Sequence, residues 1–179
     1  SMPTVTLDDG TTVKISTEIP RLGPAKIESS LPFCRFMADD ASILLNVTED
    51  HMPGIGHDPV YMYFETAGPR GQLYFDPSKT KCAIVTCGGL CPGINDVIRA
   101  IVMEAHHNYG VSAILGIRFG LEGFIPKYGH EVLELTPDSV SHCHQFGGTI
   151  LGSSRGPQAP DEIVDALERM NVSVLFMIG

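Results

Sequence analysis

Long apolar runs, basic residues and a signal peptide are the features that this sequence lacks or has little of. No stretch approaches the ~18 uninterrupted apolar residues of a membrane span, which argues against a transmembrane protein. Lys and Arg number 12 against 21 Asp and Glu, and the net charge of −9 repels nucleic-acid backbones. The five cysteines are an odd number, and the chain shows no signal-peptide pattern at its start. We therefore expect reduced thiols and a cytoplasmic protein.

The composition that remains is that of a globular protein. Apolar residues make up 43% of the 179 residues and charged residues 18%, enough for one packed domain with an extension. Residues 1–80 are rich in proline and poor in apolar runs. We therefore interpret them as an irregular N-terminal extension that wraps a neighbouring domain or a partner subunit, and residues 81–179 as the first part of an α/β domain.

A regular alternation of apolar strands and helices begins at Lys81. Four short apolar runs predict strands over Cys82–Thr86, Ser112–Ile117, Gly148–Gly152 and Val172–Ile178. Apolar residues at helical spacing from Ile94 to Ala105 predict a helix, and two more helices are expected to begin at Thr136-Pro137 and at Pro160. This alternation indicates an α/β fold, a parallel sheet with helices on both faces, in which ligands bind at the carboxyl ends of the strands.

The first predicted strand runs into a glycine-rich loop that ends at a helix. Gly88 and Gly89 allow a close approach of the backbone to a ligand, and the helix that begins near Ile94 adds its positive dipole end. This combination suits a phosphate group. The loop matches neither G-x-x-x-x-G-K-[ST] nor G-x-G-x-x-G, and a tight strand-to-helix turn without a ligand is the alternative.

Two further loops place arginines at the same predicted edge of the sheet. Arg155 and Gly156 lie among small residues, and the Arg155 guanidinium is suited to phosphate oxygens. The alternative is a surface arginine paired with Asp161 or Glu162. Arg118 can add a second positive charge near the same edge, and the phenylalanines beside it can either stack on a base or pack in the core.

The histidines and cysteines do not form a recognisable metal motif. Cys87 and Cys91 have the spacing C-x-x-x-C without a matching second pair, and His142 and His144 are two residues apart, which places them on different sides of a helix. We therefore predict no metal ligand in this chain.

Three segments together resemble the 6-phosphofructokinase family. The run CAIVTCGGLCPGINDVIR, from Cys82 to Arg99, is similar to the first nucleotide loop of its long-N-terminus branch, which is shared by plants, trypanosomatids and some bacteria. Gly147–Gln158 is similar to the second loop of that branch, and Gly116–Phe124 to the segment between them. The resemblance covers residues 66–179.

The resemblance implies a Rossmann-like nucleotide-binding domain and a phosphotransferase. Family members transfer the γ-phosphoryl group of ATP to the 1-hydroxyl of fructose 6-phosphate with Mg²⁺, giving fructose 1,6-bisphosphate in glycolysis, and we expect an allosteric homo-oligomer. Gly89, beside Gly88, matches the glycine that approaches the ATP phosphates. Arg155 matches the arginine that contacts the nucleotide and the transferring phosphoryl group, and Gly156 matches its neighbour in the nucleotide site.

The resemblance also implies that important residues lie outside this chain. Gly179 corresponds to the first glycine of the family's Gly-Gly-Asp-Gly-Thr-type loop, so we expect the magnesium ligand and the catalytic base beyond Gly179, and an inactive N-terminal fragment. The missing loop also distinguishes ATP from pyrophosphate as the donor, which leaves a pyrophosphate-dependent enzyme open. Two more hypotheses stay open: a non-catalytic fragment, and a dinucleotide-binding oxidoreductase, which the loop spacing opposes.

Overall fold

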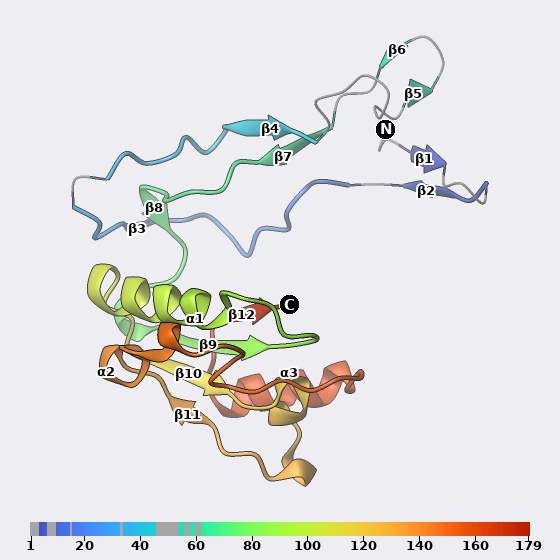
Figure 1. The fold of residues 1–179 in the computed structure, drawn as a ribbon. Coiled ribbons are helices and arrows are strands. Elements are labelled where there is room, and N and C mark those ends of the chain that lie inside the picture. Colours follow the sequence, from blue (N-terminus) through green and yellow to red (C-terminus); the bar gives the residue numbers. More distant parts are fainter. Residues whose placement is uncertain are drawn as a thin grey trace. The chain divides into compact units, whose positions relative to one another are not determined.

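The chain divides into two compact units, Ser1–Tyr74 and Phe75–Gly179 (Figure 1). The computed structural model describes residues 4–6, 10–14, 16–32, 34–45, 54–55, 58–59 and 62–179.

The first unit consists of short antiparallel strand pairs joined by irregular segments. The pairs are β1 (Thr4–Thr6) with β2 (Thr12–Lys14), β3 (Ile27–Glu28) with β8 (Gln72–Leu73), β4 (Ser42–Leu44) with β7 (Tyr63–Glu65), and β5 (Gly54–Ile55) with β6 (Asp58–Pro59). Among its described side chains, Met62 is the one buried apolar residue. Polar contacts of Arg70 join the segments of this unit instead. The Arg70 guanidinium donates to the carbonyls of Ala38 and Thr66 and lies 3.4 Å from the Glu65 carboxylate. The extension is therefore irregular, as predicted.

The second unit is built on a four-stranded sheet in the order β11-β10-β9-β12. Its strands are β9 (Lys81–Thr86), β10 (Ala113–Ile117), β11 (Leu133–Glu134) and β12 (Val174–Ile178). Strands β10 and β12 both run parallel to β9, whereas the two-residue β11 is antiparallel to β10. The parallel sheet is thus confirmed, with one short antiparallel strand added at its edge.

The central strand β9 explains why the sheet must be covered on both faces. Its side chains alternate between two apolar clusters: Cys82 and Ile84 pack in one, and Ala83 and Val85 in the other. Ile84 is fully buried, which is worth about 1.5–3 kcal/mol relative to an exposed side chain.

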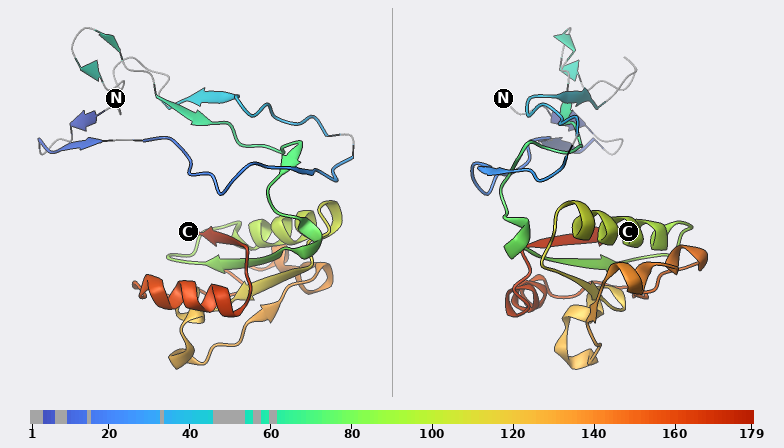
Figure 2. Two further views of the ribbon diagram at one scale, coloured as in Figure 1. Left: turned by 180° about the vertical axis from the view of Figure 1, so that it is seen from behind. Right: turned by 90° about the vertical axis from the view of Figure 1, so that its left-hand side faces the viewer.

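Helices cover the two faces of this sheet (Figure 2). On one face lie α1 (Ile94–Met103), its π-helical continuation (Glu104–Asn108), α2 (Pro137–Val140) and the 3₁₀ turn η6 (Cys143–Gln145). On the other lie α3 (Pro160–Arg169) and the 3₁₀ turn η4 (Gly120–Phe124), which η5 (Pro126–Tyr128) follows. A further 3₁₀ turn, η2 (Pro77–Lys79), precedes β9.

Local sequence signals account for the helix boundaries. Thr136 is the N-cap of α2, with Pro137 in the first turn, and its hydroxyl accepts a hydrogen bond from the amide of Ser139. Pro160 opens α3. The apolar stripe of α1 faces the sheet except at Val97, which is 44% exposed.

The strand predicted over Gly148–Gly152 is wrong. Residues 147–152 form turns instead. Gly148 and Gly152 have φ of +77° and +69°, which no extended strand allows. In the sheet, β11 lies beside β10 and β12 lies beside β9. Residues 148–152 therefore take neither of these positions.

Candidate functional site

The parallel strands end at one edge of the sheet, where a glycine-rich loop leads from β9 into α1 (Figure 1). We call residues 87–93 the glycine loop. Gly93 is the N-cap of α1, in a left-handed conformation, and no side chain caps the first turn of the helix. The free amides and the positive dipole end of α1 therefore lie at this edge, an arrangement that suits an anion.

A hydrogen bond joins the glycine loop to residues 152–157, which we call the arginine loop. The Ser153 hydroxyl donates to the carbonyl of Gly88 over 3.1 Å. Arg155 is two residues beyond this contact, and a Cβ on Gly89 would meet no atom within 4 Å. The space next to Gly89 is thus open to a ligand.

Thr86, the last residue of β9, holds the base of the arginine loop. Its side chain is 1% exposed, and its hydroxyl donates to the carbonyl of Gly152 over 2.7 Å. Because that single proton is used, the hydroxyl of Thr149, 2.9 Å away, is the donor to Thr86. The end of β9 therefore fixes both ends of the turn at 149–152.

Asn95, in the first turn of α1, ties the helix to the segment before the arginine loop. Its side chain is buried, with its amide group donating to the carbonyl of Phe146 over 2.9 Å and its carbonyl accepting from the amide of Ile150 over 2.8 Å. Both halves of the side-chain amide are thus satisfied, which burial requires.

Residues 118–124, the aromatic loop, pack against the arginine loop from the end of β10. The amide of Phe119 donates to the carbonyl of Leu151 over 2.8 Å. A Cβ on Gly152 would lie 2.9 Å from the Phe119 ring, so this packing needs glycine. Phe119 itself has φ of +60°, a conformation that costs a bulky residue about 1–2 kcal/mol.

A second glycine allows the backbones of the two loops to touch. A Cβ on Gly120 would lie 2.8 Å from both the amide nitrogen and the hydroxyl of Ser154. The Ser154 hydroxyl is buried and has no hydrogen-bond partner among the described residues. The meeting point of the loops therefore contains an unsatisfied polar group.

The two arginines of the site differ in their surroundings. Arg155 is exposed, and among the described residues it forms no ion pair with Asp161 or Glu162. Arg118 is half-buried, its guanidinium carbon lies 4.8 Å from the centre of the Phe119 ring, and its Nε has no hydrogen-bond partner in the described part of the chain. Each thus brings a positive charge that no carboxylate among the described residues neutralises.

Three cysteines of the second unit are buried or half-buried thiols. Burial raises the pKa of the thiols of Cys82, Cys87 and Cys143 above the ordinary value of 9.0, so they are protonated at neutral pH. Over the ranges that the structure describes, no group of three or more His, Cys, Asp or Glu side chains could hold a metal ion.

Sequence reasoning found the loops and missed the side chains that lock them. The predicted residues Gly88, Gly89, Arg155 and Gly156 lie in the glycine and arginine loops, which the Ser153 bond joins. The residues that lock the loops together were not predicted. A polar residue at the end of a buried strand, or in the first turn of a helix, was the available sign of such a role. The locking residues are Thr86, Asn95, Thr149 and Ser153.

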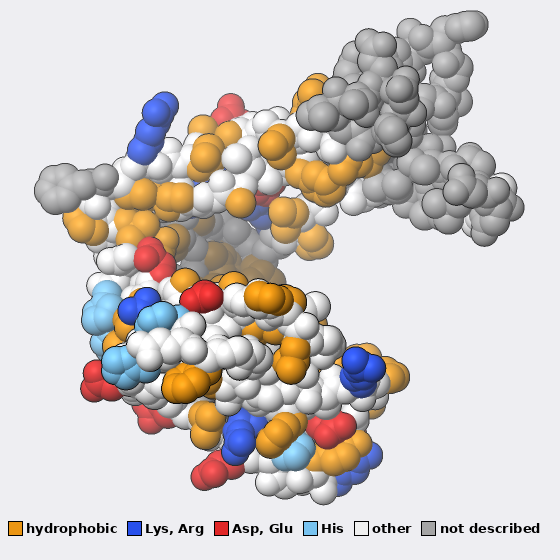
Figure 3. Space-filling model, in the orientation of Figure 1, with side chains coloured by type: hydrophobic (Ala, Val, Ile, Leu, Met, Phe, Trp, Pro, Cys, Tyr) orange, Lys and Arg blue, Asp and Glu red, His pale blue; other side chains and the backbone are white. Residues whose placement is uncertain are grey.

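Two surface features bear on binding to nucleic acids and to membranes. On the face seen in Figure 3, Lys and Arg side chains are scattered singly among neutral, apolar and acidic ones. Within the described ranges, no helix combines the length and the apolar character that crossing a bilayer requires.

Comparisons with known proteins agree on one family. The family model described as phosphofructokinase matches residues 81–179. The chain is 47% identical over 144 residues to an ATP-dependent 6-phosphofructokinase of Borreliella burgdorferi, covering 80% of this chain and 32% of that protein. It is 50% identical over 115 residues to the ATP-dependent 6-phosphofructokinase of Trypanosoma cruzi, covering 64% and 24%.

The chain spans about a quarter to a third of the length of these relatives. Among solved structures, the T-state phosphofructokinase of Pichia pastoris has a TM-score of 0.49 and 24% identity, over 76% of this chain and 15% of that one.

Proposed function

This chain belongs to the phosphofructokinase family, and we propose that its glycine, arginine and aromatic loops hold the phosphates and base of ATP in an ATP-dependent 6-phosphofructokinase. The observation that carries the proposal is the hydrogen bond between Ser153 and Gly88, which joins the glycine loop to the loop of Arg155. Phosphoryl transfer depends mainly on positioning and on charge stabilisation. Open space at Gly89 and an exposed arginine, without an ion pair among the described residues, on the loop joined to it would supply both.

In the proposed reaction, the 1-hydroxyl oxygen of fructose 6-phosphate forms a bond to the γ-phosphorus of ATP. The bond from that phosphorus to the β–γ bridging oxygen breaks, and ADP leaves with the bonding electrons. The hydroxyl proton passes to a base outside this chain. Arg155 donates to the equatorial oxygens of the transferring group, where its planar guanidinium offsets the growing charge.

The described residues fit a nucleotide but not the metal that accompanies it. Open space at Gly89, the uncapped first turn of α1 and the unsatisfied hydroxyl of Ser154 suit a polyphosphate. Arg118 and Phe119 are assigned to the base. Among the described residues no side-chain cluster suits Mg²⁺, and when bound the ion would supply neutralisation of phosphate charge.

The proposal extends to the whole protein of which these residues are part. Fructose 6-phosphate and ATP are its substrates, and it acts in glycolysis as a cytoplasmic homo-oligomer with allosteric regulation. Residues 1–80 form the extension and residues 81–179 the first part of the nucleotide-binding domain. The five free cysteines are compatible with a reducing compartment.

Steady-state assays of the full-length protein test the proposal. We expect turnover that requires fructose 6-phosphate and ATP, with little turnover when pyrophosphate replaces ATP. Preference for pyrophosphate would establish the alternative donor. Absence of turnover with either donor would reject the proposed reaction.

The second candidate concerns the 179-residue chain as isolated, which we propose to be non-catalytic. It rests on the lack of a described metal cluster. Thermal-shift titration of the chain with ATP, pyrophosphate and NAD separates weak nucleotide binding from none, and a shift with NAD alone would favour an oxidoreductase. Turnover by this chain would refute the non-catalytic assignment.

A further inference from the structure

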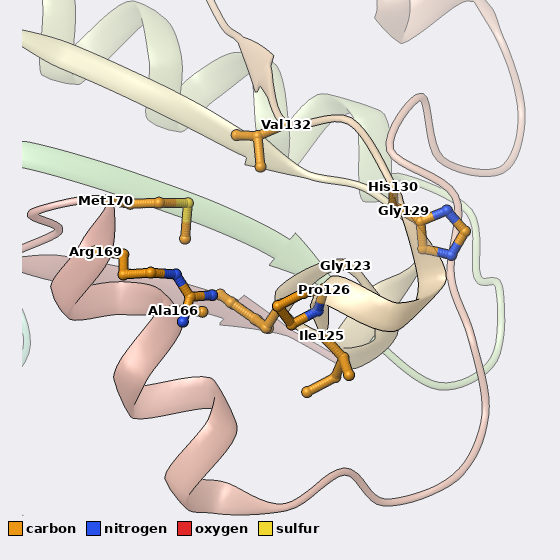
Figure 4. Close-up of a pocket in the computed structure, with 10 residues that line it drawn as sticks. Gly123, Ile125, Pro126, Gly129, His130, Val132, Ala166, Arg169 and Met170 are labelled. Atoms are coloured by element: carbon orange, nitrogen blue, oxygen red, sulfur yellow. The ribbon is translucent and has the colours of Figure 1, made fainter.

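A cavity of about 230 Å³ lies between the last turn of α3 and the segment that follows η4 (Figure 4). Polar and apolar surface line it in nearly equal measure, and its apolar side chains come from both walls. Phe124, Ile125 and Ala166 are buried, and Val132 and Met170 are half-buried. In Figure 4, the side chains of Arg169 and Met170 extend from α3 toward residues 123–126 on the other side. The cavity therefore combines apolar side chains with one guanidinium.

Arg169 is available to a ligand. It is exposed, and within the described part of the chain it forms no ion pair, not even with Asp165 one helical turn earlier. Among the described residues, Arg169 thus places a cation without an ion pair beside the apolar side chains of the cavity. It selects for a negative charge.

Arg169 is not needed to cap α3. The carbonyls of Ala166, Leu167 and Glu168 accept hydrogen bonds from the amides of the three residues after Arg169. Asn171 makes this possible with a left-handed φ of +55°. Because the backbone closes its own helix end, these carbonyls need no hydrogen bond from the guanidinium.

The same cavity is connected to the aromatic loop. Gly129 and His130 line it, and in Figure 4 the His130 ring is turned away from Arg169 and Met170. On that other side the ring contacts Phe119, with 4.5 Å between ring centres. The His130 Nε2 lies 3.6 Å from Glu122 and has no hydrogen-bond partner among the described residues, so no hydrogen bond from that nitrogen fixes the ring in place.

We propose that this cavity binds a small carboxylate with an apolar body, the carboxylate on Arg169 and the body against Phe124, Ala166 and Met170. Occupancy shifts the backbone at His130, and the His130 ring transmits the shift to Phe119 in the nucleotide site. The transmission rests on the proposed function, whereas the binding does not.

Calorimetry and ligand-observed NMR with the full-length protein test the binding. The probes are phenylacetate and its neutral analogue phenylacetamide. We expect phenylacetate to bind about tenfold more tightly, because only it forms a charge-assisted hydrogen bond. Equal affinities, or no binding of either probe, would overturn the proposal.

Two arginine variants show where the probe binds. Arg169→Met keeps the length of the side chain and removes its charge, so we expect the preference for phenylacetate to disappear. Arg35→Met removes an exposed charge from the first unit and leaves the preference unchanged. An unchanged preference in Arg169→Met would overturn the assignment even if phenylacetate binds.

The transmission is tested by the KM for ATP with and without saturating phenylacetate. We expect a change in KM in the wild-type protein and none in His130→Ala, which still binds phenylacetate. Binding without any change in KM, or a change that persists in His130→Ala, would overturn the transmission. A protein without phosphofructokinase turnover rejects the proposed function alone, since the affinities still test the cavity.

Discussion

The hydroxyl of Thr86 donates to the carbonyl of Gly152 over 2.7 Å, although 66 residues separate them in the chain. This bond links the end of the central strand to the start of the loop that carries Arg155. The geometry of the proposed phosphate site thus depends on a group that touches no phosphate.

The first prediction distinguishes the effect of the Thr86 hydroxyl on folding stability from its effect on nucleotide binding. Thr86→Val keeps the shape and leaves the carbonyl of Gly152 without its donor, which costs about 1–2 kcal/mol of folding free energy. Thr80→Val is the matched control, because Thr80 is 5% exposed and its hydroxyl donates to the carbonyl of Asp76 over 2.6 Å. Urea unfolding should give similar losses, and only Thr86→Val should raise the KM for ATP. A raised KM in both variants would contradict the assignment.

The second prediction concerns the close approach at Gly120. Gly120→Ala places a methyl group 2.8 Å from the amide of Ser154. Gly110 has a similar φ, +65° against +59°, but open space around its Cβ position, so Gly110→Ala measures the backbone cost alone, about 1 kcal/mol. Thermal unfolding should show a larger loss for Gly120→Ala, and turnover should fall in that variant only. Equal losses would mean that the loops are free to move apart.

The third prediction concerns Arg155. Since its guanidinium is exposed and unpaired, Arg155→Ala should change the folding free energy by less than about 0.5 kcal/mol. Its kcat should nevertheless fall by about a hundredfold or more, because an arginine on the transferring group acts mainly in the transition state. Arg35→Ala serves as the exposed control. Parallel losses of stability and activity in Arg155→Ala would instead indicate a structural arginine.

The fourth prediction is a loss of stability at alkaline pH. Burial raises the pKa of Cys82 in the folded state above 9.0, so below pH 9 its contribution to stability is fully present. As the pH rises above 9, the unfolded chain loses the proton first, which favours unfolding. The unfolding midpoint should therefore fall above pH 9, and less steeply in Cys82→Ala.

Val85→Ala is the control for this pH dependence. It removes buried apolar atoms from the same strand without removing a titratable group. Its midpoint should be lower at every pH while its alkaline slope stays that of the wild type. Identical slopes in all three proteins would exclude the Cys82 thiol as the cause.

The parts of the fold that were predictable from the sequence are those with local signals. The β9 run, the α1 stripe and the Thr136 cap each depend on residues within a few positions of one another, so periodicity and capping rules found them. Val97 has the spacing of this stripe and is nevertheless exposed, because spacing alone does not show which part of a helix face the neighbouring segments cover.

The parts that were not predictable depend on contacts between distant residues. Gly148–Gly152 reads as a strand by composition, but Gly148 and Gly152 are left-handed, and Gly152 contacts Thr86 and Phe119. Asn95 contacts residues more than 50 positions away. No local sequence pattern identifies such a distant partner. The loops could therefore be located from the sequence, whereas the hydrogen bonds that hold them together could not.

The locks between the loops consist entirely of neutral groups: hydroxyls, one side-chain amide and backbone carbonyls. Neutral hydrogen bonds are insensitive to ionic strength and to protonation near neutrality. The scaffold should therefore keep its form as salt and acidity vary, so that a salt dependence of nucleotide affinity is expected to arise from charged groups such as Arg118 and Arg155 rather than from these bonds.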